Sequence, residues 1–317
     1  MSKDQDATDA NGYTLGRIGE HHVVIAVLPN GQYGTTSATA VAINMNRTFS
    51  RSLRVGLMVG IGGGIPSAEH DIRLGDIVVS TPDGTCGGVL QYDMGKFVND
   101  GKLQRTGSLN SPPRSLLIAT AKMEQTTMIE DPSYPKYIEK AIQKNAQTKR
   151  NFGRPDASKD RLFQITYDHP ANAATCSACL AEQEECREPR KDDVPQVHYG
   201  IIASGNAVIK HSATRERLRQ ETRAMCFEME AAGLMTDFPC IVVRGICDYA
   251  DSHKNKQWQG YAALAAASYA KELLSYVPVA RVCKESLIAD ICSKYKLNKP
   301  PPMLSKSLQS MTGEINP

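Results

Sequence analysis

Four apolar segments of the chain end in glycine or in residues whose side chains hydrogen-bond or carry charge. The segments span 53–59, 197–204, 224–227 and 240–247, and the residues at their ends are Gly62, Gly63, Gly64, Ser204, Asn206, Glu228, Glu230 and Asp248. In open α/β sheets, ligands bind outside the carboxyl ends of the strands. Polar groups that converge at such an edge are typical of a small-molecule site, so we expect one there.

Asp248 is the residue in this set best suited to proton transfer. It ends the apolar segment 240–247. A partly desolvated carboxyl group has a raised pKa and can act as a general acid. The alternative is a structural aspartate that caps a helix or closes a turn.

Glu228 and Glu230 flank Met229 where a strand is expected to run into a helix over 228–235. Two carboxylates at this point could accept hydrogen bonds from vicinal hydroxyls of a sugar. They could equally be acids of a first helical turn, which the helix dipole favours.

The glycine-rich segment 60–64 is expected to be a loop after a buried strand. Glycines let backbone amides approach an anion or a sugar closely. The segment is no dinucleotide fingerprint, because Ile65 occupies the position of the last glycine, and no Gly-Lys-Ser/Thr follows as in a P-loop. A tight structural turn is the other interpretation.

A second cluster of potential ligands lies in the polar segment 145–195. His169, Cys176, Cys179 and Cys186 are spaced H-x6-C-x2-C-x6-C, which could hold one zinc ion. A single C-x2-C pair predicts zinc less specifically than two pairs do. We therefore favour unpaired surface thiols and expect neither a metal nor another cofactor.

These residues must be positioned by alternating strands and helices. A hairpin is expected over 13–28 and helices over 35–49, 112–130, 136–144, 215–222 and 258–276, with a strand at 76–80 in addition to the four segments above. Buried strands that alternate with helices indicate a mostly parallel sheet covered on both faces. Residues 145–195 have little apolar periodicity and are expected to form a polar surface insertion.

Composition narrows the class of protein. The 317 residues are 41% hydrophobic and 22% charged, as in ordinary globular proteins. The net charge of +3 equals that of residues 281–317, so the remaining chain is neutral and no nucleic-acid partner is expected. We expect no membrane span, since no long apolar run occurs. Cysteines within apolar runs indicate a reducing, intracellular and cytoplasmic location.

Four motifs taken together resemble those of one family. GLMVGIGGGIP (56–66), IASGN (202–206), FEMEAAG (227–233) and RGICDYADSHKN (244–255) occur in this order. The chain resembles the nucleoside phosphorylase and nucleosidase superfamily, in its fungal version, over residues 13–278. The resemblance implies a three-layer α/β/α domain with a central mixed, mostly parallel sheet, and a homo-oligomer. Residues 1–12 would be a disordered leader and 279–317 a basic, disordered tail.

The resemblance also implies roles for individual residues. Asp248 would protonate or hydrogen-bond the base at N7, and Glu230 would bind the ribose hydroxyls. The residues implied to contact substrate are Gly62, Gly63, Gly64, Ser204, Asn206, Phe227, Glu228 and Met229. Together they predict an enzyme of nucleoside metabolism that cleaves the N-glycosidic bond of a purine nucleoside or nucleotide.

Two departures from the family pattern bear on this prediction. Met58 and Ile61 stand where phosphorylases have an arginine and a serine that grip phosphate, which favours hydrolysis over phosphorolysis. Only twelve residues precede Tyr13, so we expect the family's first strand and its carboxylate to be missing. Two alternatives therefore stay open: a non-catalytic nucleoside-binding or assembly module, and a phosphorylase with phosphate as co-substrate.

Overall fold

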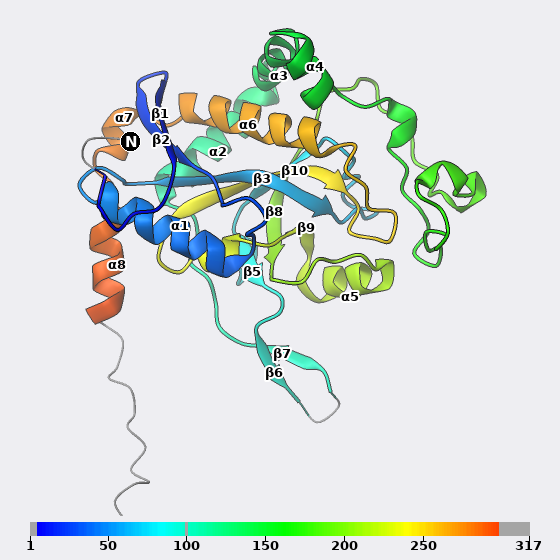
Figure 1. Ribbon diagram of the computed structural model, residues 1–317, viewed down its shortest axis with the longest axis horizontal. Helices are drawn as coiled ribbons and strands as arrows, with labels where there is room; N and C mark the ends of the chain where they lie inside the picture. The colour runs from blue at the N-terminus through cyan, green and yellow to red at the C-terminus, as the bar shows by residue number, and fades with distance from the viewer. Residues whose placement is uncertain (1–4, 99–100, 298–317) are drawn as a thin grey trace, which may run out of the picture.

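The computed structural model describes residues 5–98 and 101–297 and is built around one six-stranded sheet (Figure 1). In spatial order its strands are β4 (Ile77–Ser80), β10 (Cys240–Asp248), β3 (Gly56–Gly64), β9 (Ala224–Glu228), β8 (Val197–Ser204) and β5 (Val89–Gln91). The pairs β10–β3, β4–β8, β5–β8 and β8–β9 are parallel, whereas β10–β4 and β3–β9 are antiparallel. The expected mixed, mostly parallel sheet is confirmed.

Strand β8 gives this sheet a feature that the sequence did not predict. Its first half pairs with β4 and its second half with β5. Because β4 also pairs with β10, the strands β4, β10, β3, β9 and β8 close into a ring. The carboxyl ends of β3 and β9 meet within this ring, where Gly63 and Gly64 pair with Phe227 and Cys226.

Helices cover the sheet from opposite sides, with α6 and α1 on either side of β3 in Figure 1. The helices that correspond to those predicted from the sequence are α1 (Thr35–Thr48), α2 (Arg114–Thr127), α3 (Tyr134–Ile142), α5 (Ser212–Thr222) and α6 (Gln259–Ser275). Their positions agree with the sequence predictions to within a few residues. No helix of the described part of the chain is both long and apolar enough to span a membrane.

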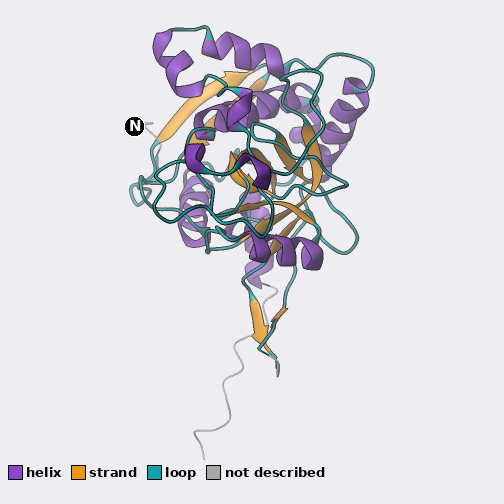
Figure 2. Cartoon of the chain, turned by 90° about the vertical axis from the view of Figure 1, so that its right-hand side faces the viewer, coloured by secondary structure: helices purple, strands orange, loops and turns teal. Residues whose placement is uncertain are grey.

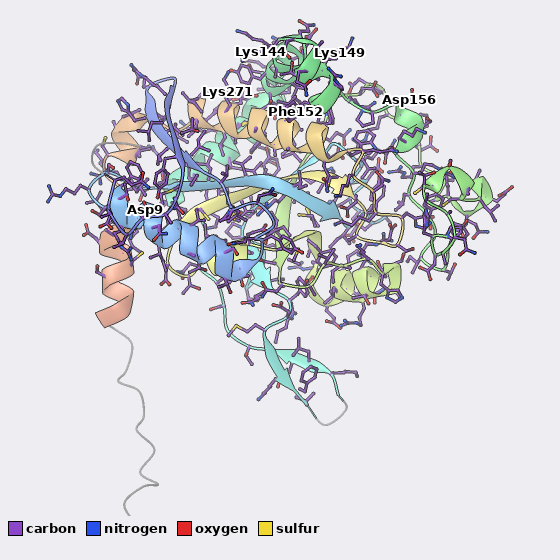
Figure 3. The ribbon with its side chains drawn as sticks, viewed as in Figure 1. Asp9, Lys144, Lys149, Phe152, Asp156 and Lys271 are labelled. Atoms are coloured by element: carbon purple, nitrogen blue, oxygen red, sulfur yellow. The ribbon has the colours of Figure 1, made fainter. Side chains whose placement is uncertain are left out.

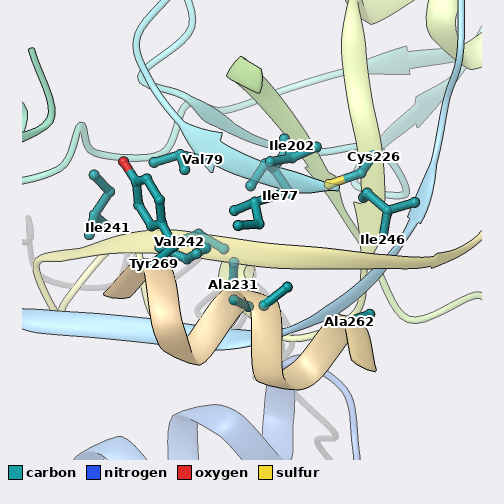
Figure 4. Packing of buried hydrophobic residues seen from close by; sticks show 14 of the residues in the cluster. Ile77, Val79, Ile202, Cys226, Ala231, Ile241, Val242, Ile246, Ala262 and Tyr269 are labelled. Atoms are coloured by element: carbon teal, nitrogen blue, oxygen red, sulfur yellow. The ribbon is translucent and has the colours of Figure 1, made fainter. Parts of the chain in front are cut away.

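The main core lies between α6 and the strands. Ile77, Ile202, Ile246 and Ala262 are fully buried there, together with the ring of Tyr269 (Figure 4). Alanines along α6 let its backbone approach β10 so closely that only a glycine fits opposite Ala262. That glycine is Gly245, where a Cβ would lie 1.9 Å from the carbonyl oxygen of Ala262.

The N-terminal segment differs from the disordered leader that was expected. In residues 5–12, Asp9 is buried and accepts a hydrogen bond from the hydroxyl of Tyr13 at 2.6 Å and another from Thr48 at the end of α1. Figure 3 labels Asp9 beside that helix. The leader packs because these hydroxyls satisfy a carboxylate that would otherwise be costly to bury. The hairpin of β1 (Tyr13–Ile18) and β2 (His21–Ala26) then follows as expected.

The disordered tail is also wrong for residues 279–297, which form α7 (Val279–Val282) and α8 (Ile288–Leu297). The reason is apolar burial, since Ile288 is fully buried in the main core and its amide donates to the carbonyl of Leu53 at 2.9 Å. The net positive charge of this segment hid that anchor. The remainder of the tail, 298–317, lies outside the described residues.

Three local predictions need correction. The glycine segment 60–64 belongs to β3 and is not a loop, because neighbouring strands pair with it on both edges. The helix expected over 228–235 is reduced to a 3-10 turn at Ala231–Gly233. The insertion 145–195 carries α4 (Ala146–Phe152) and three 3-10 turns, and it is no mere surface segment, because Phe163 is fully buried.

One hairpin, formed by β6 (Gly95–Phe97) and β7 (Leu103–Arg105), was not predicted from the sequence. Its strands pair only three residues each and project from the body in both views (Figures 1 and 2). Segments this short give no legible alternation of apolar and polar residues.

The contact between Gly245 and α6 yields a stability prediction. We expect Gly245→Ala to lower the free energy of unfolding by about 1–3 kcal/mol or more, because the new methyl group must displace the helix backbone. Thermal unfolding followed by circular dichroism measures this. Gly16→Ala in β1 is the matched control, since a Cβ there meets nothing within 4 Å. Equal unfolding temperatures for the two variants would contradict the packing argument.

Candidate functional site

The registers of three strands bring the predicted site residues to one place. Gly63 of β3 lies beside Asp248 of β10 on one side and beside Phe227 of β9 on the other. A β-bulge at Cys247 adjusts β10 so that Asp248 reaches this position. A Cβ on Gly63 would lie 2.8 Å from Oδ1 of Asp248, so only glycine permits this approach.

Asp248 is buried, and its carboxylate oxygens have separate partners. Oδ1 accepts a hydrogen bond from the amide of Ala250 at 2.9 Å. Oδ2 lies 2.9 Å from Nζ of Lys254 and accepts from the Cys247 thiol at 3.2 Å. The contact with Ala250 is the turn bond of the structural alternative, but the ion pair with Lys254 adds a cation beside the carboxylate.

Glu228 takes a structural position that differs from its expected place at a ligand. Its side chain is fully buried and forms an ion pair with Arg244. It also accepts hydrogen bonds from the amides of Glu230 at 3.1 Å and Ala231 at 3.0 Å. Because these partners occupy both carboxylate oxygens, Glu228 holds the turn after β9 in place.

Glu230 is the carboxylate of this pair that has capacity left for a ligand. Its side chain is 14% exposed, and its contacts with Nη2 of Arg244 and with the amide of Gly34 are both long, at 3.4 Å. Burial raises the pKa of Glu230, and the neighbouring Glu228 raises it further, whereas Arg244 acts in the opposite direction.

Arg244 and Lys254 are site residues to which sequence analysis assigned no role. Arg244 is a charge inside the apolar segment 240–247, and a buried charge requires a partner. That requirement was the available signal, and Glu228 meets it. Gly60 makes room for the guanidinium, because a Cβ there would lie 2.2 Å from Nη1.

Ser204 and Asn206 support the site in different ways. Ser204 is fully buried, and its hydroxyl accepts the amide of Ala232 at 2.9 Å, which fixes the turn after β9. Asn206 is exposed, and its Oδ1 accepts the amide of Thr35 at 3.1 Å. The start of α1 is thereby held over the ends of β8 and β9, where Gly34 reaches Glu230.

The remaining predicted residues line the same strand ends. Phe227 is buried edge-on against Tyr92, with ring centroids 5.6 Å apart, and Met229 is half-buried between the two glutamates. Gly62 and Gly64 are buried within β3. A separate polar cavity beneath the insertion, lined by residues that include Arg73 and Arg190, contains none of the predicted site residues.

The structure brings together three of the four potential zinc ligands. The ligand atoms of His169, Cys176 and Cys179 all lie within 4.8 Å of one another. Cys186 is exposed and does not belong to this group.

Comparison with known proteins agrees with this architecture. A family model described as the phosphorylase superfamily matches residues 7–277. The chain is 50% identical over 273 residues to a nucleotide-binding leucine-rich repeat (NLR)-like protein of Hyaloscypha variabilis, an alignment that covers 86% of this chain and 26% of that protein. It therefore spans about a quarter of that relative's length.

Two further similarities cover most of both proteins compared. The chain is 25% identical over 277 residues to the 5'-methylthioadenosine/S-adenosylhomocysteine nucleosidase of Mycobacterium bovis, covering 86% of this chain and 87% of the relative. The solved structure of the futalosine hydrolase of Helicobacter pylori superposes with a TM-score of 0.52 over 84% of each chain at 16% identity. At this identity the similarity supports a shared fold and nothing further. With the family model matched over residues 7–277, the chain belongs to the phosphorylase superfamily.

Proposed function

We propose that this protein hydrolyses the N-glycosidic bond of purine nucleosides or nucleotides. The observation that carries the proposal is the placement of two unlike acidic groups at one sheet edge. Asp248 is ion-paired with Lys254, whereas Glu230 is only loosely held by Arg244. Asp248 is thus paired with a cation, and Glu230 is available to accept hydrogen bonds from a ligand.

This pairing suits the charges that develop as the bond breaks. The ribose ring becomes positive and the departing base negative. Asp248, with Lys254 as the adjacent proton source, would neutralise the base by protonating or hydrogen-bonding its N7. Glu230 would accept hydrogen bonds from the ribose hydroxyls, which orients the ring and stabilises its positive charge.

Water is the nucleophile that the residues around β3 favour. Met58 and Ile61 have apolar side chains that cannot bind a phosphate dianion. Arg244, the buried cation nearby, already faces the two carboxylates of Glu228 and Glu230. A further anion there would lack an unpaired positive charge, so hydrolysis fits better than phosphorolysis.

The similarity to a nucleosidase of Mycobacterium bovis supports the reaction class. Incubation with adenosine, methylthioadenosine and ATP, with and without inorganic phosphate, tests it. We expect free purine base and an unphosphorylated C1 hydroxyl on the sugar product, at rates that do not depend on phosphate. Phosphate-dependent release of a sugar 1-phosphate would contradict hydrolysis, and absence of base from every substrate would contradict the activity.

Glu230→Gln tests the sugar-binding carboxylate. We expect kcat/KM to fall by about 10²-fold or more, the usual cost of removing one electrostatic contact to a transition state. Glu20→Gln, on the exposed hairpin, is the matched control and should retain activity. Comparable loss in both variants would show that the effect is not specific to the site.

The pH dependence of the wild type gives an independent measurement. Burial raises the pKa of Glu230 above its ordinary value of 4.5, so the acid limb of the rate profile should lie above pH 4.5 and should flatten in Glu230→Gln. The folded state also binds this proton more tightly than the unfolded chain. The contribution of protonated Glu230 to the free energy of unfolding is therefore present at low pH and lost as the pH rises through the raised pKa. At pH 8, Glu230→Gln should unfold at a higher temperature than the wild type.

Lys254→Met tests the proton source beside Asp248. We expect a loss of about 10²-fold or more in kcat/KM, within the range for general acid catalysis. Lys256→Met is the matched control, because Lys256 is exposed only two residues away. Full activity of Lys254→Met in a base-release assay would remove the lysine from the mechanism.

A further inference from the structure

The insertion 145–195 folds a cluster of soft ligands against the loop that follows Asp248. The imidazole of His169 and the thiols of Cys176 and Cys179 place their ligand atoms within 4.8 Å of one another. The insertion also forms hydrogen bonds with residues 252 and 253 of the loop after β10. The amide of His169 donates to Oγ of Ser252 at 3.0 Å, and the Cys176 thiol donates to the carbonyl of His253 at 3.5 Å.

The neighbouring His253 has a polar group that the protein leaves unused. Its side chain is 4% exposed, and neither ring nitrogen makes a hydrogen bond among the described residues, although Nδ1 lies 3.7 Å from Oδ1 of Asp251. Stacking on Phe163, at 4.0 Å between ring centroids, occupies one face of the ring and leaves Nε2 in the ring plane with no polar contact among the described residues. A buried imidazole in this condition is unfavourable unless a ligand meets one of its nitrogens.

The separations suit a tetrahedral metal ion. Bonds of about 2.3 Å to sulfur and about 2.0 Å to nitrogen place tetrahedral ligand atoms roughly 3.5–3.8 Å apart. The three-residue cluster needs only a small contraction to reach this spacing, whereas His253 does not belong to the group within 4.8 Å and must move toward it. Two imidazoles on one such ion have ring centres about 5 Å apart, and the rings of His169 and His253 lie at 5.5 Å.

The surrounding contacts prepare the ligands for a cation. Nδ1 of His169 lies 3.1 Å from the carbonyl oxygen of Pro170. Since a carbonyl only accepts, Nδ1 carries the proton and Nε2 keeps its lone pair for a metal. Arg161 donates to the carbonyls of both Cys176 and Cys179, which fixes the C-x2-C turn and adds positive charge near the two sulfurs.

We propose that this protein binds one Zn²⁺ through His169, Cys176, Cys179 and His253. Two thiolates and two imidazoles are the ligand set of structural zinc sites, and they select zinc over the harder magnesium and calcium ions. With all four positions filled by protein, the ion is structural. The ion cross-links the insertion to the loop after β10, from which Lys254 contacts Asp248. This proposal does not depend on which substrate binds at the strand ends.

Metal content of the whole chain tests the proposal. Protein purified under reducing conditions, reconstituted with Zn²⁺ and desalted should retain one zinc per chain by elemental analysis. Cys179→Ser should retain less than about a tenth of that amount. The matched control is Cys186→Ser, which removes an exposed thiol of the same insertion and should retain one zinc. The proposal is overturned if the reconstituted wild type lacks zinc, if both variants bind it equally, or if a Cys176–Cys179 disulfide persists in protein purified under reducing conditions.

Three further measurements test the assigned ligands, and two of them use the wild type, so they do not depend on whether a variant folds well. Co²⁺ in the wild type should give a thiolate charge-transfer band and the intense visible absorption of a tetrahedral site, and the weak absorption of an octahedral site would exclude the assigned ligands.

His253→Ala should weaken Zn²⁺ binding at least about 10-fold in competition with a chromophoric chelator, and unchanged affinity would remove His253 from the site. A strong chelator should lower the unfolding temperature of the wild type because metal binding adds to folding free energy.

Discussion

The close approach of β3 to its two neighbours is the constraint on which the candidate site depends. Strands β9 and β10 can bring a carboxylate, a guanidinium and a backbone carbonyl against β3 only if β3 has no side chains there. A Cβ on Gly60, Gly62 or Gly63 would lie 2.2 Å from Arg244, 2.8 Å from the carbonyl of Phe227 and 2.8 Å from Asp248, respectively. The glycines therefore provide space within the sheet, and the functional groups of β9 and β10 fill it.

Charge within that space is balanced unevenly. Arg244 is one cation against the carboxylates of Glu228 and Glu230, and its closer contact is with Glu228. Glu228 is neutralised and structural as a result, whereas Glu230 keeps a raised pKa and unused capacity to accept hydrogen bonds. Asp248 has its own cation in Lys254. Two acidic groups with different partners can thus serve the two ends of a breaking glycosidic bond.

The insertion connects to this site through the loop after β10. Phe163 stacks on His253, and His169 is tied to Ser252, so residues far apart in the sequence hold the loop from which Lys254 reaches Asp248. The polar composition of residues 145–195 predicted only a surface insertion. Side chains from both segments in fact share one cluster, and a metal ion bound there would add its binding free energy to the stability of the connection.

Sequence alone determined the alternation of strands and helices, the family, and the strand ends that carry Asp248 and Glu230, because buried strands and the residues that end them form short local patterns. Tertiary structure decided what depends on contacts between distant segments. Only the fold separates Glu228 from Glu230, since Arg244 approaches one more closely than the other. Only the fold turns the glycine segment into a strand, buries Asp9 and Ile288, and excludes Cys186 from a cluster whose spacing in sequence suits it equally well. Spacing along a chain limits which residues can meet, but packing and charge select those that do.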